Sequence, residues 1–102
     1  MKIFKLHQDK IEVFRNWAKQ VNGELREEAI LSLQEENCTR EIFQLFKIND
    51  IYYAVAHMEG DNIIPANVER EINKKHHEVL RECIEKQIST ETLYDLSVKN
   101  SG

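Results

Sequence analysis

The sequence contains few prolines and glycines, which interrupt helices and strands, and few cysteines, which can form disulfide bonds. Its 102 residues include one proline, three glycines and two cysteines. Such low Pro and Gly contents exclude collagen-like and linker-like sequences, whereas 41% apolar and 31% charged residues are typical of a soluble globular protein. A chain of this length can bury one core but not two. We therefore expect a single domain over residues 1–98, followed by a short flexible tail over residues 99–102.

Signals for secretion, membrane insertion and nucleic-acid binding are also missing. The opening residues, MKIFKLHQDK, contain no apolar run long enough for a signal peptide or a membrane anchor. Cys38 and Cys83 lack the CxxC spacing, which favours two reduced thiols that pack in the interior. The net charge of −4 argues against the basic face typical of nucleic-acid binders. We expect a cytoplasmic protein that binds neither membranes nor nucleic acid.

Motifs for metal and phosphate chemistry are absent as well. The sequence contains no Gly-rich phosphate loop, no HExxH and no pair of histidines four residues apart. The one conceivable metal cluster, His7 with Glu41 and His57, lacks any such spacing. We therefore expect neither a metal nor a cofactor.

Two alternating segments are the strongest structural signal. TREIFQLFKI (39–48) and IYYAVAHME (51–59) alternate in the way β-strands do, and Asn49-Asp50 between them tolerates the left-handed conformations of a tight turn. This pattern predicts a β-hairpin. Alternation in KIFKLH (2–7) predicts a first strand. The short apolar segment LYDLSV (93–98), which is bounded by polar residues, predicts a last strand.

Two apolar stripes at helical spacing separate these strands. The first runs from Lys10 to about Glu36 and stays nearly in phase across Asn22-Gly23, so it predicts one long helix that bends at most. The second begins after Asn67, a good N-cap residue, and runs to about Lys86. The resulting order, βαββαβ, predicts a ferredoxin-like α+β fold in which a four-stranded antiparallel sheet carries both helices on one face.

The other face of this sheet should then remain uncovered. Because small residues suit close helix packing, we expect Ala54 and Ala56 to face the helices. To the same side we assign Phe4, Leu6, Ile42, Phe46 and Ile48. To the open side we assign Ile3, Lys5, His7, Glu41, Phe43, Leu45, Lys47, Tyr53, Val55, His57 and Glu59.

This open face supports two hypotheses. Its apolar residues predict a homodimer that forms through the open sheet face, since large exposed apolar patches usually mark association surfaces. Alternatively, two sheets enclose a cavity that binds a small organic molecule. The candidate ligand-binding residues of that cavity are Lys5, His7, Glu41, Phe43 and Val55.

The element order and the segment from His76 to Cys83 (HHEVLREC) resemble the dimeric α+β barrel superfamily, and more narrowly one of its small bacterial families without assigned function. That superfamily includes cofactor-independent monooxygenases and sugar mutarotases that bind ligands between sheet and helices. The resemblance implies a homodimer with a pocket. It transfers no catalytic set to this chain residue by residue.

The candidate catalytic residues are Tyr53, His57 and His76, as a polar anchor and possible acids or bases. His76 lies on the second apolar stripe, where a histidine is commonly a hydrogen-bonded core residue, and His77 should lie at the surface. The alternative function is a non-enzymatic dimerisation or protein-interaction module that uses Phe43, Leu45 and Val55 of the open face. A solvated helix face is expected for the acidic run Glu24, Glu27, Glu28, Glu35 and Glu36.

Overall fold

The fold is an α+β arrangement of one sheet and three helices. A computed structural model describes residues 1–98, so the predicted tail at 99–102 lies outside the described residues. The elements are β1 (Lys2–Leu6), a 3-10 turn η1 (Gln8–Lys10), α1 (Ile11–Asn22), α2 (Arg26–Glu35), β2 (Arg40–Ile48), β3 (Ile51–Glu59), α3 (Glu71–Cys83) and β4 (Ile84–Ile88). The antiparallel sheet has the order β2-β3-β1-β4, consistent with the predicted ferredoxin-like fold.

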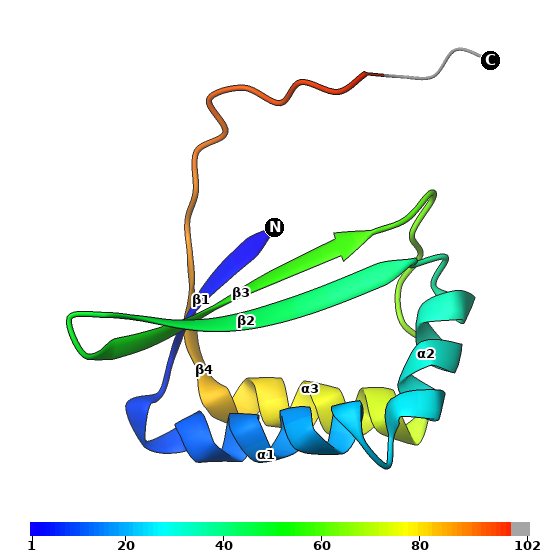
Figure 1. Ribbon diagram of the computed structural model, residues 1–102, viewed down its shortest axis with the longest axis horizontal. Helices are drawn as coiled ribbons and strands as arrows, with labels where there is room; N and C mark the ends of the chain where they lie inside the picture. The colour runs from blue at the N-terminus through cyan, green and yellow to red at the C-terminus, as the bar shows by residue number, and fades with distance from the viewer. Residues whose placement is uncertain (99–102) are drawn as a thin grey trace.

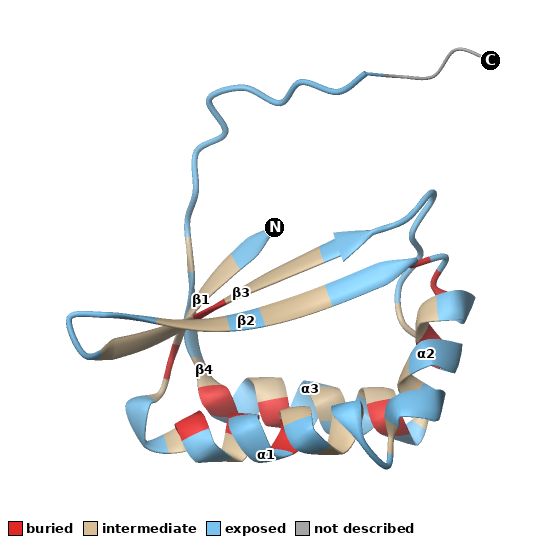
Figure 2. Ribbon diagram, viewed as in Figure 1, coloured by how far each residue is buried: buried red, intermediate tan, exposed pale blue. Residues whose placement is uncertain are grey.

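The helices lie on one side of the sheet. In Figure 1, α1 and α3 run beneath it, and α2 stands at one end. The buried residues gather between these layers, while the residues after β4 are exposed (Figure 2). Within residues 1–98, no helix combines the length and the apolar character that a membrane crossing requires. The core consists of Leu6, Ile11, Phe14, Trp17, Ala54, Ile72, Val79 and Cys83.

The hairpin between β2 and β3 is closed by a two-residue turn. Asn49 and Asp50 have φ angles of 49° and 63°, both in the left-handed region. Two central residues with positive φ are characteristic of the turn whose twist matches that of antiparallel strands. The turn pairs Ile48 with Ile51, and the pairing continues to Arg40 and Glu59. The predicted hairpin and its turn are therefore confirmed.

The register of this hairpin corrects the predicted faces of β2. Phe43 lies opposite Ala56 and Leu45 opposite Ala54, and directly paired residues of an antiparallel pair project to the same side. Since Ala54 is buried on the helix side, Phe43 and Leu45 also face the helices. The prediction had put them on the open face because it assigned the two strands separately, without following the pairing through the turn.

The same register moves the other residues of β2. Glu41 and Lys47 lie on the helix side with Phe43 and Leu45. The residues that we assigned to the helices, Ile42, Phe46 and Ile48, instead face the open side with Tyr53, Val55 and His57. A shift of one residue in register reverses the face of every side chain in a strand, which is why the error affects the whole of β2.

The first helical segment is broken where a continuous helix was predicted. α1 ends at Asn22, and α2 begins at Arg26 after Gly23. The amides of Gly23 and Leu25 both donate to the carbonyl of Gln20, which closes α1 and lets the chain change direction. The apolar stripe continues across the break because Leu25 and Ala29 still pack against the α1 core. Continuity of the stripe therefore did not require continuity of the helix.

The last strand also differs from the prediction. β4 is Ile84–Ile88 and follows α3 directly, where the prediction had extended the helix to Lys86. It pairs with β1, and the amide of His7 donates to the carbonyl of Cys83 at the junction. Residues 93–98, the predicted last strand, have no regular secondary structure and are exposed. The strand that pairs with β1 is therefore residues 84–88 (IEKQI), not the more apolar residues 93–98 (LYDLSV).

Gly60 lies where the end of β3 passes the chain that leads into β2. A Cβ atom at this position would be 2.3 Å from the carbonyl oxygen of Asn37 and 3.0 Å from the Cα atom of Cys38. Both atoms belong to the backbone, which cannot move aside as the end of a flexible side chain would. Glycine is therefore required here by close backbone approach.

We expect Gly60→Ala to lower the free energy of unfolding by about 2 kcal/mol, because the added methyl group must displace backbone. Urea denaturation followed by the fluorescence of Trp17 measures this change. Asp61→Ala is the matched control, because Asp61 is the exposed next residue and its loss should change stability by less than about 0.5 kcal/mol. Equal stability of Gly60→Ala and the natural protein would contradict the close approach.

Candidate functional site

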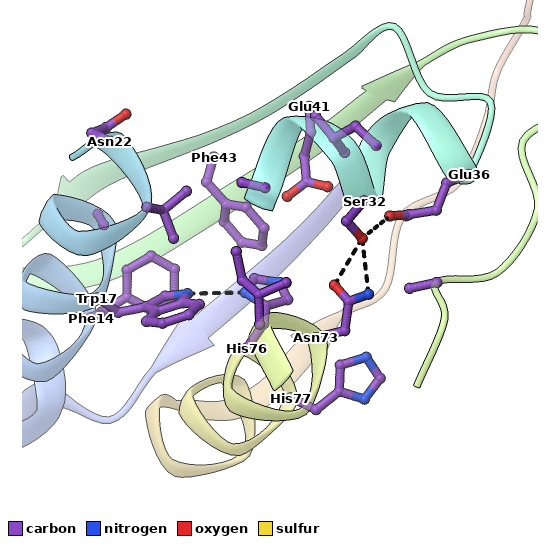
Figure 3. Close-up of a pocket in the computed structure, with 16 residues that line it drawn as sticks. Phe14, Trp17, Asn22, Ser32, Glu36, Glu41, Phe43, Asn73, His76 and His77 are labelled. Atoms are coloured by element: carbon purple, nitrogen blue, oxygen red, sulfur yellow. Dashed lines mark hydrogen bonds between the residues drawn. The ribbon is translucent and has the colours of Figure 1, made fainter. Parts of the chain in front are cut away.

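A pocket opens between the helices and the sheet. Its volume is about 260 Å³, and its wall is formed by α1, α2, α3 and β2 (Figure 3). The pocket exists because α2 turns away from α1 and stands at the end of the sheet (Figure 1). Its lining residues are Phe14, Trp17, Ala18, Val21, Asn22, Ala29, Ser32, Leu33, Glu36, Glu41, Phe43, Ala66, Ile72, Asn73, His76 and His77.

One wall of the pocket is aromatic. The ring of Phe43 lies 5.6 Å from that of Phe14 and 6.1 Å from that of His76. Trp17 lies 6.0 Å from His76. These centroid separations are typical of aromatic pairs, which hold one another in fixed orientations. This wall can accept the flat apolar part of a ligand.

His76 is held in this wall by a hydrogen bond. The indole Nε1–H of Trp17 donates to Nδ1 of His76 at 3.0 Å. Burial lowers the pKa of His76, and the neighbouring His77 lowers it further, so the ring is neutral at pH 7. Because Nδ1 accepts, the proton of the neutral ring is on Nε2. His76 is therefore a hydrogen-bond donor to the pocket and is poorly suited to act as a base.

A polar network connects α2 to α3 on the opposite side. The hydroxyl of Ser32 donates to Oε2 of Glu36 at 2.9 Å and accepts from Nδ2 of Asn73 at 2.9 Å (Figure 3). Asn73 also donates to the carbonyl of Asn67 at 2.9 Å. Ser32 and Glu36 are only 3% and 7% exposed, so their polar groups depend on these partners. The network fixes the Glu36 carboxyl at the pocket wall.

Glu41 adds a second carboxyl group. Its side chain is exposed along part of its length, but the carboxyl points into the pocket (Figure 3). Burial raises the pKa of Glu41, and the nearby Glu36 raises it further. Two carboxyl groups in one pocket repel each other when both are ionised. A bound cation or hydrogen-bond donor would relieve this repulsion.

The pocket thus combines an aromatic wall with a carboxylate end. Its potential donor is Nε2 of His76, and its potential acceptors are Glu36 and Glu41. The arrangement suits recognition of an amphipathic molecule.

The structure divides the predicted site residues between two faces of the sheet. Glu41 and Phe43 line the pocket with His76. Lys5, Tyr53, Val55 and His57 lie on the open face instead. The predicted grouping of Glu41 and Phe43 with the open-face residues is therefore wrong, whereas a cavity on the open face between two subunits stays a prediction. The residues of the open face cannot reach a ligand held on the helix side of the same sheet.

Residues of the open face have local partners of their own. Nζ of Lys5 lies 3.1 Å from Oε2 of Glu85. The ring of Tyr53 stacks on Phe46 at 5.5 Å, and Nε2 of His57 lies 3.4 Å from Oε1 of Glu59.

His7 lies outside both groups. It follows β1 and precedes η1, and its carbonyl accepts from the amide of Lys10. The suggested cluster of His7, Glu41 and His57 is not assembled, since Glu41 and His57 project from opposite faces of the sheet.

Most of the pocket lining was missed from the sequence, and three of the missed residues form its polar network. Ser32 and Asn73 were not considered, and Glu36 was assigned to a solvated acidic face although it is buried. A signal existed in the helical spacing. Ser32 lies three residues after Ala29 and four before Glu36, and Asn73 lies three before His76, so all of them share faces with pocket residues.

Comparison with known proteins identifies the family but no characterised relative. The family model of DUF6176, described as a family of unknown function, matches residues 1–100. No curated protein and no solved structure matches the chain.

The lowered pKa of His76 predicts a pH dependence of stability. Between this pKa and about 6.5, the unfolded chain binds a proton at His76 that the folded chain does not. The free energy of unfolding should therefore fall as the pH drops below about 6.5. The raised pKa of Glu41 acts in the opposite direction, so the contribution of His76 has to be isolated by substitution.

We expect His76→Gln to keep an acceptor for Trp17 and to remove this loss of stability at low pH. Urea midpoints between pH 5 and pH 7.5 measure the difference between the variant and the natural protein. His77→Gln is the control, since His77 is exposed and should leave most of the pH dependence in place. A pH profile unchanged by His76→Gln would contradict the assignment.

Proposed function

The chain belongs to DUF6176, a family of unknown function, and we propose that it is a homodimer that binds a small organic molecule in the pocket between helices and sheet. One observation carries this proposal. Two carboxyl groups, Glu36 and Glu41, end at a pocket whose other wall is aromatic, and none of its described lining residues is Lys or Arg. Convergent polar groups in an otherwise apolar cavity are typical of ligand sites.

The pocket specifies the chemistry of its ligand. Phe14, Trp17 and Phe43 favour a flat apolar body. The carboxylate end favours a protonated amine or another strong hydrogen-bond donor, because an anionic group would meet like charges. A volume of about 260 Å³ suits a molecule with about one aromatic ring and a short side chain. We therefore propose an aryl-alkyl amine or a molecule of similar polarity.

Dimerisation is the second part of the proposal. The open face of the sheet carries large apolar residues on all four strands, and no helix covers it in the described part of the chain (Figure 1). Ile48 is 55% exposed and the other apolar residues of this face are half-buried, and a sheet face with many partly exposed apolar residues is typical of an association surface. If the open faces of two copies pack against each other, they form the dimeric α+β barrel that the sequence resembles. The apolar residues concerned are Ile3, Ile42, Phe46, Ile48, Ile51, Tyr53, Val55 and Ile88.

This open face also favours the alternative function, a non-enzymatic dimerisation or protein-interaction module. Of the three residues first assigned to such a module, Val55 remains on this face, while Phe43 and Leu45 contribute to the core. A protein with only this alternative function would bind no specific ligand in the pocket. Ligand binding at the carboxylate end therefore separates the two functions.

We expect phenethylamine to bind in the pocket and to shift the indole N–H resonance of Trp17, the only tryptophan. Its ring would contact the aromatic wall and its ammonium group the carboxylates. A titration followed by ¹⁵N–¹H NMR measures the dissociation constant. Phenylacetate, which has the same ring and the opposite charge, should bind at least about tenfold more weakly, a difference of roughly 1.4 kcal/mol.

Substitutions on the two faces of the sheet provide the control. Glu41→Gln should weaken phenethylamine binding and reduce its advantage over phenylacetate, because one carboxylate is lost. Tyr53→Phe should leave both dissociation constants unchanged, because Tyr53 lies on the open face. Equal binding of the two compounds, or no binding of either, would refute the proposed ligand class.

For the dimer, we expect sedimentation equilibrium to give twice the chain mass at micromolar concentration. Phe46→Glu should produce monomers with unchanged far-ultraviolet circular dichroism, since it places a charge in the apolar face. Ile30→Glu adds the same charge at an exposed apolar position of α2 and should leave the dimer intact. A natural protein that sediments as a monomer would exclude this interface.

A further inference from the structure

Residues 89–98, which we name the C-terminal arm, contain four large apolar side chains with no place in the fold. The arm follows β4 and has no regular secondary structure. Leu93, Tyr94, Leu96 and Val98 are between 80% and 97% exposed. Burying each of these side chains would contribute about 1.5–3 kcal/mol of stabilisation. Their exposure therefore favours a contact that buries them.

The arm extends from the body in a particular direction. Figure 1 shows it leaving the sheet on the side opposite to the helices, which is the side of the open face. The Cα radius of gyration is 15.2 Å, whereas a compact domain of this length has about 13 Å. The arm therefore projects into the space that a second copy would occupy in the proposed dimer.

The arm also has the pattern of a β-strand. Tyr94, Leu96 and Val98 alternate with Asp95 and Ser97, so one side of an extended arm is apolar. A last strand was predicted here because the segment is short, apolar and bounded by polar residues, but the corresponding position beside β1 is occupied by β4. Residues 93–98 therefore have the pattern of a strand but form none within the single chain.

An unpaired sheet edge can accept such a strand. β2 forms one edge of the sheet, and its nine residues make it longer than β4 at the other edge. Strand edges readily pair with an extended segment of another chain. Charge also fits, because β2 carries Arg40 and Lys47 against the single acid Glu41, while the arm carries Glu91 and Asp95 and no base.

We propose that the arm of each subunit crosses to the second copy and pairs as a β-strand with the outer edge of its β2. This inference rests on the proposed dimer and adds the element that holds it together. Tyr94, Leu96 and Val98 extend the apolar face formed by Ile42, Phe46 and Ile48 of the other subunit. In this arrangement, the sheet of each subunit gains a fifth strand from its partner.

The length of the arm permits this exchange. The ten residues 89–98 can span at most about 33 Å when extended, at ~3.3 Å per residue. A four-stranded sheet is only about 14 Å wide between its outer strands, at ~4.8 Å per gap. Because a facing sheet also lies about 10 Å away, the path is about 17 Å and takes about five extended residues, which leaves about five for pairing.

We expect the full-length double variant Leu96→Ser/Val98→Ser to raise the dimer dissociation constant at least about tenfold in sedimentation equilibrium, because two apolar side chains per arm lose their contacts. The matched control is Val68→Ser, which removes an exposed apolar side chain outside the arm and should leave the dissociation constant unchanged. Hydrogen exchange of the natural dimer should also show slow amides at 94, 96 or 98.

Each outcome has a separate meaning. A natural protein that dimerises with the same dissociation constant as the double variant would overturn the arm proposal but leave the sheet-face dimer standing. A natural protein that stays monomeric would overturn both. Loss of thermal stability in the double variant without any change in the dissociation constant would show that the arm folds back on its own subunit and would also overturn the proposal.

Discussion

The register of the β2–β3 hairpin is the constraint on which the rest of the structure depends. A turn of two residues, both with positive φ, fixes Phe43 opposite Ala56 and thereby sends it to the helix side. From that position Phe43 contacts Phe14 and His76 and becomes part of the pocket wall. A shift of one residue would move the aromatic wall to the opposite face and empty the pocket.

The break after α1 supplies the second half of the pocket. Because the chain turns at Gly23, α2 stands at the end of the sheet instead of continuing along it (Figure 1). Ser32 and Glu36 then face Asn73 of α3, and the three form a buried network. The aromatic wall and the carboxylate end therefore have different origins. The first depends on a β-turn, and the second depends on a helix break.

Much of the fold could be predicted from the sequence because its signals are local. Alternation identified the hairpin, and helical spacing placed His76 on the inner face of α3, where Trp17 now contacts it. Features that depend on competition between segments were not predictable in this way. Residues 84–88 (IEKQI) pair with β1 and residues 93–98 (LYDLSV) do not, and no local pattern indicates that choice.

The candidate site was predicted less well than the fold. The residue types were appropriate, but the faces of β2 were assigned without the pairing that the turn imposes, so Glu41 and Phe43 were grouped with Tyr53 and His57. That error was avoidable, since a two-residue turn already determines which residues lie opposite each other. The buried state of Glu36 depends on α2 turning at the break, which the apolar stripe does not reveal.

The division of side chains between the two faces can be measured directly. In the proposed dimer, mixing isotope-labelled and unlabelled chains allows nuclear Overhauser effects between subunits to be observed separately from those within a subunit. The account predicts contacts between subunits from Phe46 and Val55 and none from Phe43. Contacts between subunits from Phe43, with none from Phe46 and Val55, would contradict it.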